Sequence, residues 1–324
     1  MTELGKPMSF DDIDRFFKTH DNYNILTHKN PDGDTLGCGF ALCRYLRNCG
    51  KNANVINSEE FPSRYKLLYE GYQPQNFDVQ CVVAVDIADV QLMGEGLEEY
   101  KKPGKVDLCI DHHISNKHYA KAEYVDGKAS AASLVLYEFL KHINAGIDDC
   151  MAECMYLGIA TDTGCFKFEN TIPEAHIAAA ELMQYNFDFA AVNRKMFDLK
   201  SKGRLKAERI VMSGIKYYCR NQCAVICLTK ELMSSCGVEE SEFDGLASMP
   251  LQVEGVQIGI TIKERDENVY KISVRTTPEV NACEFCGNFG GGGHIRAAGC
   301  EIKGNLNYVI NALVEQAEKV LNHE

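Results

Sequence analysis

The feature that most constrains the fold is a series of short apolar runs in the first half of the chain, separated by longer amphipathic stretches. The apolar runs cover residues 24–27, 53–56, 81–85 and 106–110. Between and after them, helix-like patterns cover residues 36–46, 133–143 and 151–160. The first of these helices is expected to start at Thr35. Strands that alternate with helices form βαβ units, in which the strands pair in parallel. The pattern therefore predicts an α/β fold with a mostly parallel sheet flanked by helices.

The pattern changes in the second half of the chain. Residues 187–215 are helical in pattern and rich in Lys and Arg, and we predict that they form a helical linker. Beyond them, strand-like runs cover residues 224–229, 256–263 and 269–275, and an amphipathic helix is expected over 306–321. We therefore predict a first domain over residues 1–186, the linker over 187–215, and a smaller α/β domain over 216–324. A chain of 324 residues is long enough for two cores.

Composition limits the class of partner. The net charge of −12 disfavours a long basic groove for duplex DNA or extended RNA, because such grooves need many Lys and Arg side chains. No stretch approaches the roughly 18 apolar residues of a membrane span, and the first residues lack the pattern of a signal peptide. We therefore expect a cytoplasmic protein whose fifteen cysteines are reduced and mostly buried. Cys283 and Cys286 have the spacing of half a zinc site, but no second pair follows.

Acidic and histidine residues follow the apolar runs, and one closes a helix-like segment. They are, in chain order, His28, Asp32, Asp34, Asp86, Asp111, His112, His113 and Asp162. In an open α/β sheet, ligands bind beyond the carboxyl ends of the strands, so these side chains are expected to lie together. In the first of these loops, Pro31 and Gly33 are expected to turn the chain so that its side chains point to a common centre.

Any one of these aspartates, taken alone, is more often a turn or cap residue than a ligand. Together the acids would repel one another strongly without a cation, so their joint occurrence favours bound metal. Mixed His and Asp ligands favour Mn²⁺, with Mg²⁺ as the alternative, and the residues alone do not give the number of ions. The other histidines outside the C-terminal segment, which follow no apolar strand, are expected to be structural or exposed: His20, His118, His142 and His176.

Four segments of the first half resemble the motifs of a known family. HKNPDGDTLG, VAVDIAD, DHH and GIATDTG are similar, in order and approximate spacing, to the four motifs of the DHH phosphoesterase superfamily. The segment SVRTTPEVNACEFCGNFGGGGHIRAAG resembles the substrate-binding domain that accompanies the DHH domain in one large branch of that family. The resemblance covers nearly the whole chain. It departs from the family pattern at residues 283–286, where aliphatic and small residues are usual.

The resemblance implies a two-metal site. One ion would be held by His28, Asp32 and Asp86, and the other by Asp34, Asp86, His112 and Asp162. Asp86 would then bridge the two ions, and a hydroxide shared between them would attack phosphorus in line. His113 would face the substrate as a catalytic residue. Asp111 is expected to support this site, either by orienting His112 or by capping a neighbouring loop.

A glycine-rich segment in the second half precedes His294. Runs such as Gly290–Gly293 are more often flexible turns, although their backbone N–H groups can approach an anion closely. The resemblance implies that this segment binds the terminal phosphate and nucleoside of the substrate across a cleft from the metals, and that the substrate is only a few nucleotides long. The residues expected to do so are Arg275, Gly291, Gly292, Gly293 and His294.

The resemblance implies a hydrolase. The architecture is similar to the stand-alone branch that degrades very short RNA to 5′-mononucleotides, a nanoRNase activity, and dephosphorylates 3′-phosphoadenosine 5′-phosphate to AMP. Similar enzymes hydrolyse cyclic or linear dinucleotide messengers of the c-di-AMP or pApA type, and the sequence separates the two readings poorly. A non-catalytic nucleotide sensor is disfavoured by the intact ligand positions. Short RNA and small phosphorylated nucleotides are thus the expected partners, with no duplex nucleic acid and no membrane, and a homodimer is left open.

Overall fold

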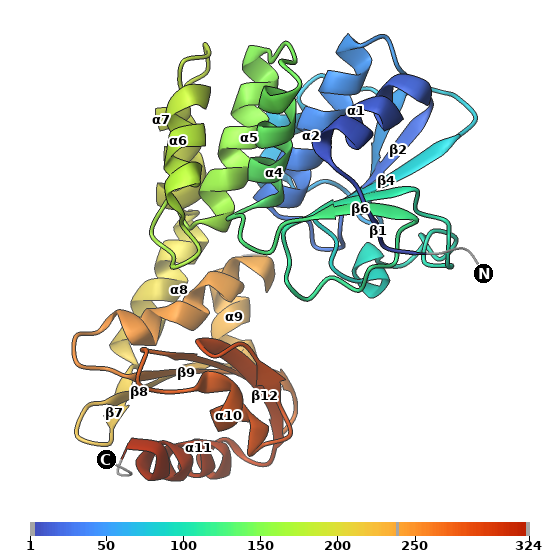
Figure 1. The fold of residues 1–324 in the computed structure, drawn as a ribbon. Coiled ribbons are helices and arrows are strands. Elements are labelled where there is room, and N and C mark those ends of the chain that lie inside the picture. The colour runs from blue at the N-terminus through green and yellow to red at the C-terminus, as the bar shows by residue number, and fades with distance from the viewer. Residues whose placement is uncertain (1–3, 238–239, 322–324) are drawn as a thin grey trace. The chain divides into compact units, whose positions relative to one another are not determined.

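The computed structural model describes residues 4–237 and 240–321. The chain folds into two compact units that divide between Leu199 and Lys200 (Figure 1). Each unit contains its own six-stranded sheet and its own buried apolar core. The predicted linker over residues 187–215 includes this division, and its boundaries stay a prediction.

The first unit is built on a sheet with the strand order β1-β6-β5-β4-β2-β3, in which every pair of neighbours is parallel. The strands are β1 (Lys6–Pro7), β2 (Tyr23–Leu26), β3 (Ala53–Ile56), β4 (Cys81–Val85), β5 (Leu108–Asp111) and β6 (Ala122–Val125). The predicted parallel α/β sheet is therefore confirmed, and the predicted strands correspond to β2, β3, β4 and β5. The short strands β1 and β6 were not predicted.

Both faces of this sheet are covered, which is why its central strands are apolar throughout. On one face Ile25 and Val83 pack against the main helices, and on the other Leu26 and Ala84 pack against loop residues such as Met93. Successive side chains of a strand point to opposite faces, so each strand contributes side chains to the apolar cluster on either face of the sheet.

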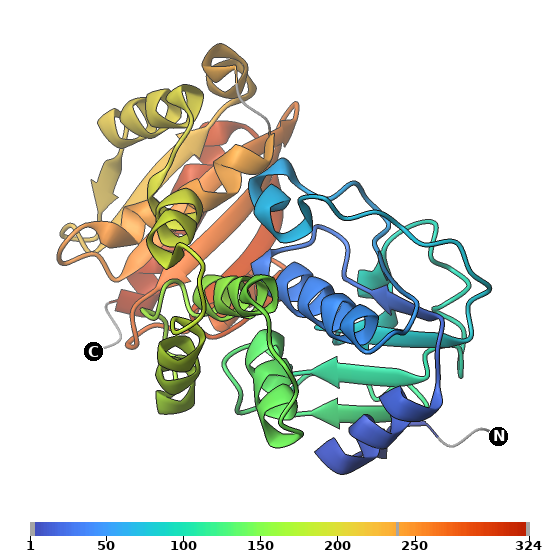
Figure 2. The ribbon, with the colours of Figure 1, turned by 90° about the horizontal axis from the view of Figure 1, so that it is seen from above.

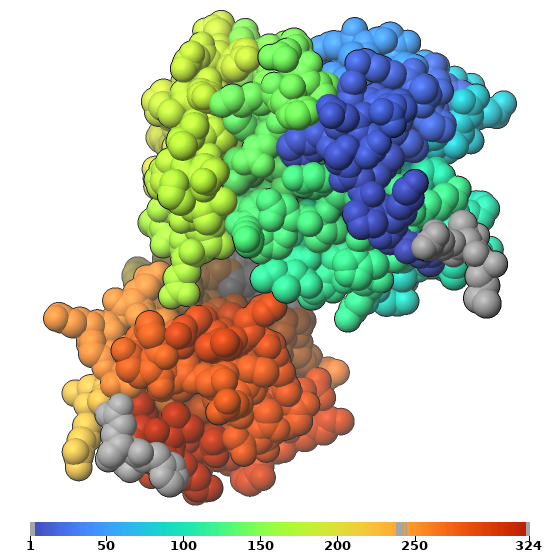
Figure 3. Space-filling model, viewed as in Figure 1, coloured from blue at the N-terminus to red at the C-terminus, as the bar shows by residue number. Residues whose placement is uncertain are grey.

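Helices α2, α4 and α5 lie side by side on one face of the first sheet (Figures 1 and 2). The helices of the first unit are α1 (Phe10–Thr19), α2 (Gly33–Asn48), α3 (Lys66–Tyr69), α4 (Ala132–His142), α5 (Asp149–Asp162), α6 (Pro173–Leu182) and α7 (Phe189–Asn193). Short 3₁₀ turns cover residues 63–65 and 90–93, and a π turn covers 194–198. Helix α1 lies at the surface, with Ile13 and Phe17 buried beneath it (Figure 3).

The contact between α2 and α5 is close because small residues line it. A Cβ atom on Gly37 of α2 would lie 2.5 Å from the carbonyl oxygen of Cys154 in α5. A Cβ atom on Gly33 would lie 2.3 Å from Oγ1 of Thr161. Both distances are shorter than any real contact of that kind, so only glycine permits this packing. The start of α2 and the end of α5 are thereby held together, and both carry predicted site residues.

The second unit contains a mixed sheet with the order β11-β12-β10-β9-β8-β7, in which β8 and β9 are parallel and the other neighbours antiparallel. The strands are β7 (Lys216–Tyr218), β8 (Cys223–Leu228), β9 (Ile258–Asp266), β10 (Val269–Thr276), β11 (Gly292–Gly293) and β12 (Ala297–Lys303). The helices are α8 (Lys202–Ser213), α9 (Lys230–Cys236), α10 (Ala282–Gly287) and α11 (Leu306–Leu321), with 3₁₀ structure over Glu240–Gln252. A second α/β unit, as predicted, is confirmed.

This second sheet is also covered on both faces. Phe285 of α10 and Leu313 of α11 pack on one face with Ile272, while Ala207 and Val211 of α8 pack on the other. All fifteen cysteines lie in the described part of the chain, and each is a free thiol. Within residues 4–237 and 240–321, no helix has the length and apolar character needed to span a membrane.

Candidate metal centre

The residues that the sequence singled out in the first unit lie together at the carboxyl edge of its sheet. Asp86 directly follows β4, Asp111 is the last residue of β5, and Asp162 is the last residue of α5. Asp32 is the N-cap of α2, and Asp34 lies in the first turn of that helix. His28, His112 and His113 occupy the loops that follow β2 and β5. The parallel order of the strands places the positions after β2, β4 and β5 at one edge, and the packing of α5 against the start of α2 brings Asp162 to them.

One group of potential ligands consists of His28, Asp32 and Asp86. Nε2 of His28 lies 3.6 Å from Oδ1 of Asp32 and 3.6 Å from Oδ2 of Asp86. Nδ1 of His28 lies 2.8 Å from the carbonyl oxygen of Lys29 and donates to it when protonated. In that tautomer, the Nε2 lone pair faces the two carboxylates. A carbonyl that fixes the tautomer in this way is usual for metal-binding histidines.

A second group consists of Asp34, His112 and Asp162. Nε2 of His112 lies 3.9 Å from Oδ2 of Asp34, 3.6 Å from Oδ2 of Asp162 and 3.5 Å from Oδ1 of Asp86. Nδ1 of His112 lies 3.1 Å from the carbonyl oxygen of Ala129, which fixes this ring in the same way. Asp86 thus contributes one carboxylate oxygen toward each group, because its Oδ2 faces His28 and its Oδ1 faces His112.

Asp34 is buried and is held by the first turn of α4. Its Oδ2 accepts a hydrogen bond of 2.6 Å from the backbone N–H of Ala132, and its Oδ1 accepts one of 2.8 Å from that of Ser133. The N-cap residue of α4, Ala131, has no side chain that could accept these bonds. Asp34 therefore caps α4 from another helix, and the positive end of the α4 dipole favours its negative charge.

Asp86 shows two signs of a functional position. It is 3% exposed, and its Oδ1 has no hydrogen-bond partner. Its backbone has a φ of 57°, in the left-handed region that non-glycine residues rarely adopt. A buried carboxylate oxygen without a donor, among other carboxylates and imidazoles, has the ligand environment that a divalent cation requires. The residues present therefore fit a site for divalent metal ions.

The electrostatics of the centre lead to the same conclusion. Burial alone would lower the pKa of the histidines, but contacts with Asp32 and Asp86 raise the pKa of His28 to about 11. Contacts with Asp86, Asp34 and Asp162 likewise raise the pKa of His112 to about 10. Burial, together with Asp86 and the other carboxylates, raises the pKa of Asp162 to about 6 and that of Asp34 well above its ordinary value. The cluster thus favours bound positive charge.

Asp111 orients His113, which answers a question that the sequence left open. Oδ1 of Asp111 accepts a hydrogen bond of 2.7 Å from Nδ1 of His113 and one of 2.8 Å from the backbone N–H of His112. Its Oδ2 accepts a bond of 2.6 Å from Nδ2 of Asn116. Although Asp111 is fully buried, these bonds lower its pKa, and it in turn raises the pKa of His113. The His112 ring is not its partner.

The first loop does not turn as the sequence predicted. The residue in the left-handed conformation is Asn30, with a φ of 51°, whereas Gly33 is already the first residue of α2. Gly33 is needed for a different reason, because a side chain there would overlap Thr161. The turn is therefore made by an asparagine, a residue that tolerates the left-handed region better than most.

Three amides that the sequence analysis did not single out support the centre. Asn57 donates to the carbonyl oxygen of His28, Asn116 donates to Asp111, and Asn170 donates to the carbonyl oxygen of Asp162. Asn57 follows the apolar run 53–56, so the rule that identified the aspartates could have identified it too. Four histidines that were expected to be structural or exposed have partners outside the centre: His20 contacts Phe16, His118 contacts Glu123, His142 contacts Asp11, and His176 stacks on Phe166.

The predicted substrate-binding residues of the second unit lie close together in its sheet. Arg275 on β10 pairs with Ala297 of β12, which follows the turn at His294. Gly292 and Gly293 form β11, which pairs with the same strand. The arginine is partly buried, and burial lowers its pKa.

Backbone N–H groups of the glycine-rich segment are largely used within the protein. Those of Gly290, Gly291 and His294 donate to the carbonyl oxygens of Gly287, Cys286 and Ala297. These three amides therefore do not form the anion-binding nest that a glycine run suggests. The side chains of Arg275 and His294 are half-buried and exposed, respectively, and the predicted roles of Gly291, Gly292 and Gly293 stay a prediction.

Two family models match the chain. The model described as "DHH family, N-terminal domain" matches residues 22–159, and the "DHHA1 domain" matches residues 225–323. The chain contains a DHH domain and a DHHA1 domain. The DHH match includes the predicted site residues from His28 to His113, and Asp162 follows three residues after its end.

Named relatives are similar to this chain over most of their length. A protein of Streptococcus mutans named probable bifunctional oligoribonuclease and PAP phosphatase NrnA is 28% identical over 284 residues, or 87% of this chain and 90% of the relative. The bifunctional oligoribonuclease and PAP phosphatase NrnA of Thermus thermophilus is 29% identical over 306 residues, or 92% and 89%. The DHH and DHHA1 domains together with these relatives identify the chain as a hydrolase.

A solved structure shares the whole fold. The crystal structure of an exopolyphosphatase-related protein from Bacteroides fragilis matches with a TM-score of 0.85 and 24% identity, and the match covers 97% of each chain. At this identity the likeness establishes the architecture and not the activity.

Proposed function

We propose that this DHH-family hydrolase is a phosphoesterase that depends on two metal ions, Mn²⁺ in preference to Mg²⁺. Its substrates would be short RNA oligonucleotides, released as 5′-mononucleotides, and 3′-phosphoadenosine 5′-phosphate, converted to AMP. The observation that carries the proposal is the convergence of histidines and carboxylates around the buried carboxylate of Asp86, whose Oδ1 has no hydrogen-bond partner. The names of the relatives from S. mutans and T. thermophilus support the choice of substrates.

The residues that would hold the ions fall into the two groups described above. His28, Asp32 and Asp86 would hold one ion, and Asp34, Asp86, His112 and Asp162 the other. When bound, two such ions supply an activated water molecule at neutral pH and stabilise the oxygens of an in-line displacement at phosphorus. The protein contributes ligands whose orientation is already fixed, by the carbonyls of Lys29 and Ala129 and by the first turn of α4.

His113 is the residue of the centre that we assign to the substrate. Its Nδ1 is bound to Asp111, so its Nε2 is left to face a phosphoryl oxygen or the leaving oxygen. Its side chain is 41% exposed, far more than the 12% of His112. The buried carboxylate of Asp111 stabilises the protonated imidazole, which can donate a proton to the leaving oxygen. Asp111 therefore acts through His113.

The second unit is proposed to bind the end of the substrate that is not hydrolysed. The guanidinium group of Arg275 can bind a phosphate through two parallel hydrogen bonds, and the exposed ring of His294 can donate to the same group. Such a contact holds the substrate on the protein equally in the ground state and the transition state, and takes no part in the reaction itself.

The proposal is tested by incubating the protein with Mn²⁺ and a panel of substrates. The panel contains RNA dimers to pentamers, an RNA of about twenty nucleotides, 3′-phosphoadenosine 5′-phosphate, and cyclic and linear dinucleotides. We expect 5′-mononucleotides from the dimers to pentamers, AMP from the phosphorylated nucleotide, and little product from the long RNA. Turnover of cyclic dinucleotides alone would contradict the substrate assignment and would favour the messenger phosphodiesterases instead.

A further inference from the structure

Asn57 extends the pairing of β2 and β3 beyond the point where the strands end. The last backbone hydrogen bond between them runs from the N–H of Thr27 to the carbonyl oxygen of Ile56. The next donor is the side chain of Asn57, whose Nδ2 lies 2.8 Å from the carbonyl oxygen of His28 and 2.8 Å from Oγ1 of Thr27. Oδ1 of Asn57 accepts a bond of 2.8 Å from the N–H of Glu59. Both ends of the amide are thus held in place.

Glu59 holds the same loop two residues further along. Its Oε2 accepts a hydrogen bond of 3.0 Å from the backbone N–H of Asn30, the residue with a φ of 51°. Between these two contacts, the N–H of Lys29 donates to the carbonyl oxygen of Leu92 over 2.6 Å. The backbone from His28 to Asn30 is therefore held at three successive residues from other segments of the chain.

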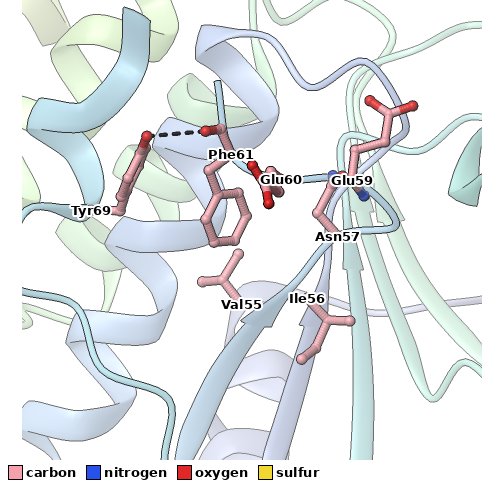
Figure 4. Close-up of a pocket in the computed structure, with 7 residues that line it drawn as sticks. All are labelled: Val55, Ile56, Asn57, Glu59, Glu60, Phe61 and Tyr69. Atoms are coloured by element: carbon pink, nitrogen blue, oxygen red, sulfur yellow. Dashed lines mark hydrogen bonds between the residues drawn. The ribbon is translucent and has the colours of Figure 1, made fainter. Parts of the chain in front are cut away.

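This arrangement fixes the atom that orients the His28 ring. The carbonyl oxygen of Lys29 binds Nδ1 of His28 and so directs Nε2 toward Asp32 and Asp86. That carbonyl belongs to the same peptide group as the N–H of Asn30, which Glu59 binds. The preceding peptide group is held by Asn57 through the carbonyl oxygen of His28. Figure 4 shows Asn57 and Glu59 just beyond the carboxyl end of β3. They also line a shallow cavity of about 360 Å³, which contains none of the predicted metal ligands.

We propose that Asn57, with Glu59, is a positioning residue that sets His28 for binding one of the two metal ions. This inference rests on the proposed function, since it assumes that His28 is a metal ligand. Residues that orient ligands from outside the coordination sphere typically contribute about tenfold or more to metal affinity. Loss of Asn57 is expected to lower the affinity for the ion at His28, Asp32 and Asp86. The affinity for the ion at His112 and Asp162 should not change.

Asn54, on β3 just before Asn57, provides a matched control. Its Nδ2 donates to the carbonyl oxygen of Gln75, and its Oδ1 accepts from the N–H of Gln75 and from Arg47. Asn54 is buried and Asn57 is half-buried, and the side chain of each holds a loop. The side chain of Asn54 bonds to Arg47, Tyr72 and Gln75, and not to residues 27–30. If Asn57 were only structural, Asn54→Ala and Asn57→Ala would have similar effects.

The experiment is a titration of the metal-free full-length protein with Mn²⁺, in which free Mn²⁺ is followed by its paramagnetic resonance signal. We expect the unaltered protein to bind two Mn²⁺ ions. Asn57→Ala should bind one of them with about tenfold lower affinity, and Asn54→Ala should bind both with unchanged affinity. The weakened ion should be the one that His28→Ala loses. Equal affinities for Asn57→Ala and the unaltered protein, or equal losses in the two asparagine variants, would overturn the inference.

A second pair of variants covers the case in which Asn57→Ala does not fold. Glu59 is exposed, and Glu59→Ala removes its hydrogen bond to the N–H of Asn30. Glu60 is also exposed, and Glu60→Ala is the control because it removes one negative charge without removing that bond. We expect Glu59→Ala to lower the affinity for one Mn²⁺ ion about threefold, which corresponds to the loss of one hydrogen bond. Glu60→Ala is expected to leave both affinities unchanged. Identical titrations for the two glutamate variants would count against the inference.

These titrations contain no nucleotide, so they separate the inference from the proposed substrates. If Asn57→Ala lowers the affinity for one ion but the unaltered protein hydrolyses no short RNA, the positioning role is supported and the proposed substrates are wrong. If short RNA is hydrolysed and Asn57→Ala binds both ions normally, the positioning role fails and the proposed function stands. An unaltered protein that binds no Mn²⁺ would overturn the inference together with the metal centre.

Discussion

At the scale of single residues, the centre combines positions that are costly in the metal-free protein. Asp86 has a left-handed backbone, a conformation that costs a non-glycine residue about 1–2 kcal/mol, and a buried oxygen without a donor. Burial and the charge of Asp86 raise the pKa of both Asp34 and Asp162, and Asp162 raises the pKa of Asp34 further. Costs of this kind persist where they serve function, and here a bound cation would offset the repulsion between carboxylates and pair with the buried oxygen of Asp86.

The substitution Asp86→Asn separates stability from activity. Asparagine tolerates the left-handed backbone, but its amide cannot pair with the protonated rings of His28 and His112 as the carboxylate does. In the absence of metal at neutral pH we expect the free energy of unfolding to fall by only about 1 kcal/mol, measured by urea denaturation in a chelator. Hydrolysis with Mn²⁺ is expected to fall at least about a hundredfold. A variant that keeps its activity would show that Asp86 is not a ligand.

Metal binding should release protons. Below their raised pKa values of about 11 and about 10, His28 and His112 are protonated in the metal-free protein, and each must lose its proton to bind a cation. The affinity for Mn²⁺ is therefore expected to increase as the pH rises through the neutral range. Calorimetric titrations in buffers with different ionisation enthalpies measure the number of protons released. A binding enthalpy that does not depend on the buffer would contradict these protonation states.

At the scale of elements, the structure shows which features a single sequence can reveal. The strands β2 to β5 could be predicted because both of their faces are buried, so apolar residues run without a break. Strand β6 contains the charged Glu123, and β1 has only two residues, so neither shows such a run. Helix α1 was not predicted, although Ser9 and Asp12 form a capping box at its N-terminus. Such a pair of residues in the sequence indicates the start of a helix.

The site residues could be predicted for a similar reason. A strand that ends in Asp or His places that residue at the edge of the sheet whatever its neighbours are, so Asp86 and His112 were found from position alone. The partner of Asp111 depends on which way two adjacent imidazoles point, and this is decided by the Ala129 carbonyl far along the chain. Asn57 was not identified because asparagine after a strand is common in ordinary turns.

The close contact of α2 and α5 can be tested with Gly37→Ala. The added Cβ would lie 2.5 Å from the backbone oxygen of Cys154, which cannot move without shifting α5. Overpacking costs about 1–3 kcal/mol, and the helix propensity of alanine offsets about 1 kcal/mol. We therefore expect a net loss in unfolding free energy and weaker Mn²⁺ binding, since α5 carries Asp162.

The control is Gly146→Ala in the loop before α5. A Cβ atom there would meet nothing within 4 Å. This change should leave stability unaltered or raise it by up to about 1 kcal/mol. Thermal unfolding of the two variants would be compared with and without Mn²⁺. If both glycines tolerate alanine equally, the two helices are not packed as closely as described.

At the scale of the whole molecule, the two units have separate cores and different proposed tasks. The first carries the candidate metal centre, and the second carries Arg275 and His294. A residue that binds only the unreacting end of a substrate contributes equally to the ground state and the transition state, so its loss raises KM and leaves kcat nearly unchanged. The division of tasks therefore predicts different kinetic changes for substitutions in the two units.

Arg275→Ala tests that division. We expect KM for an RNA dimer to increase about tenfold or more, with kcat changed by less than about threefold. Lys271→Ala is the matched control, because it removes one positive charge from an exposed side chain on the same strand. Steady-state kinetics of both variants with Mn²⁺ would measure the effects. A fall in kcat with unchanged KM would place Arg275 in the reaction itself.

The central claim is that the clustered histidines and aspartates of the first unit hold two metal ions around Asp86. The most direct measurement is anomalous X-ray diffraction at the manganese edge, from crystals of the full-length protein grown with Mn²⁺. We predict two anomalous peaks about 3.5–4 Å apart, one beside His28 and Asp32 and the other beside His112 and Asp162, with Asp86 between them. A single peak, or peaks away from these residues, would contradict the account.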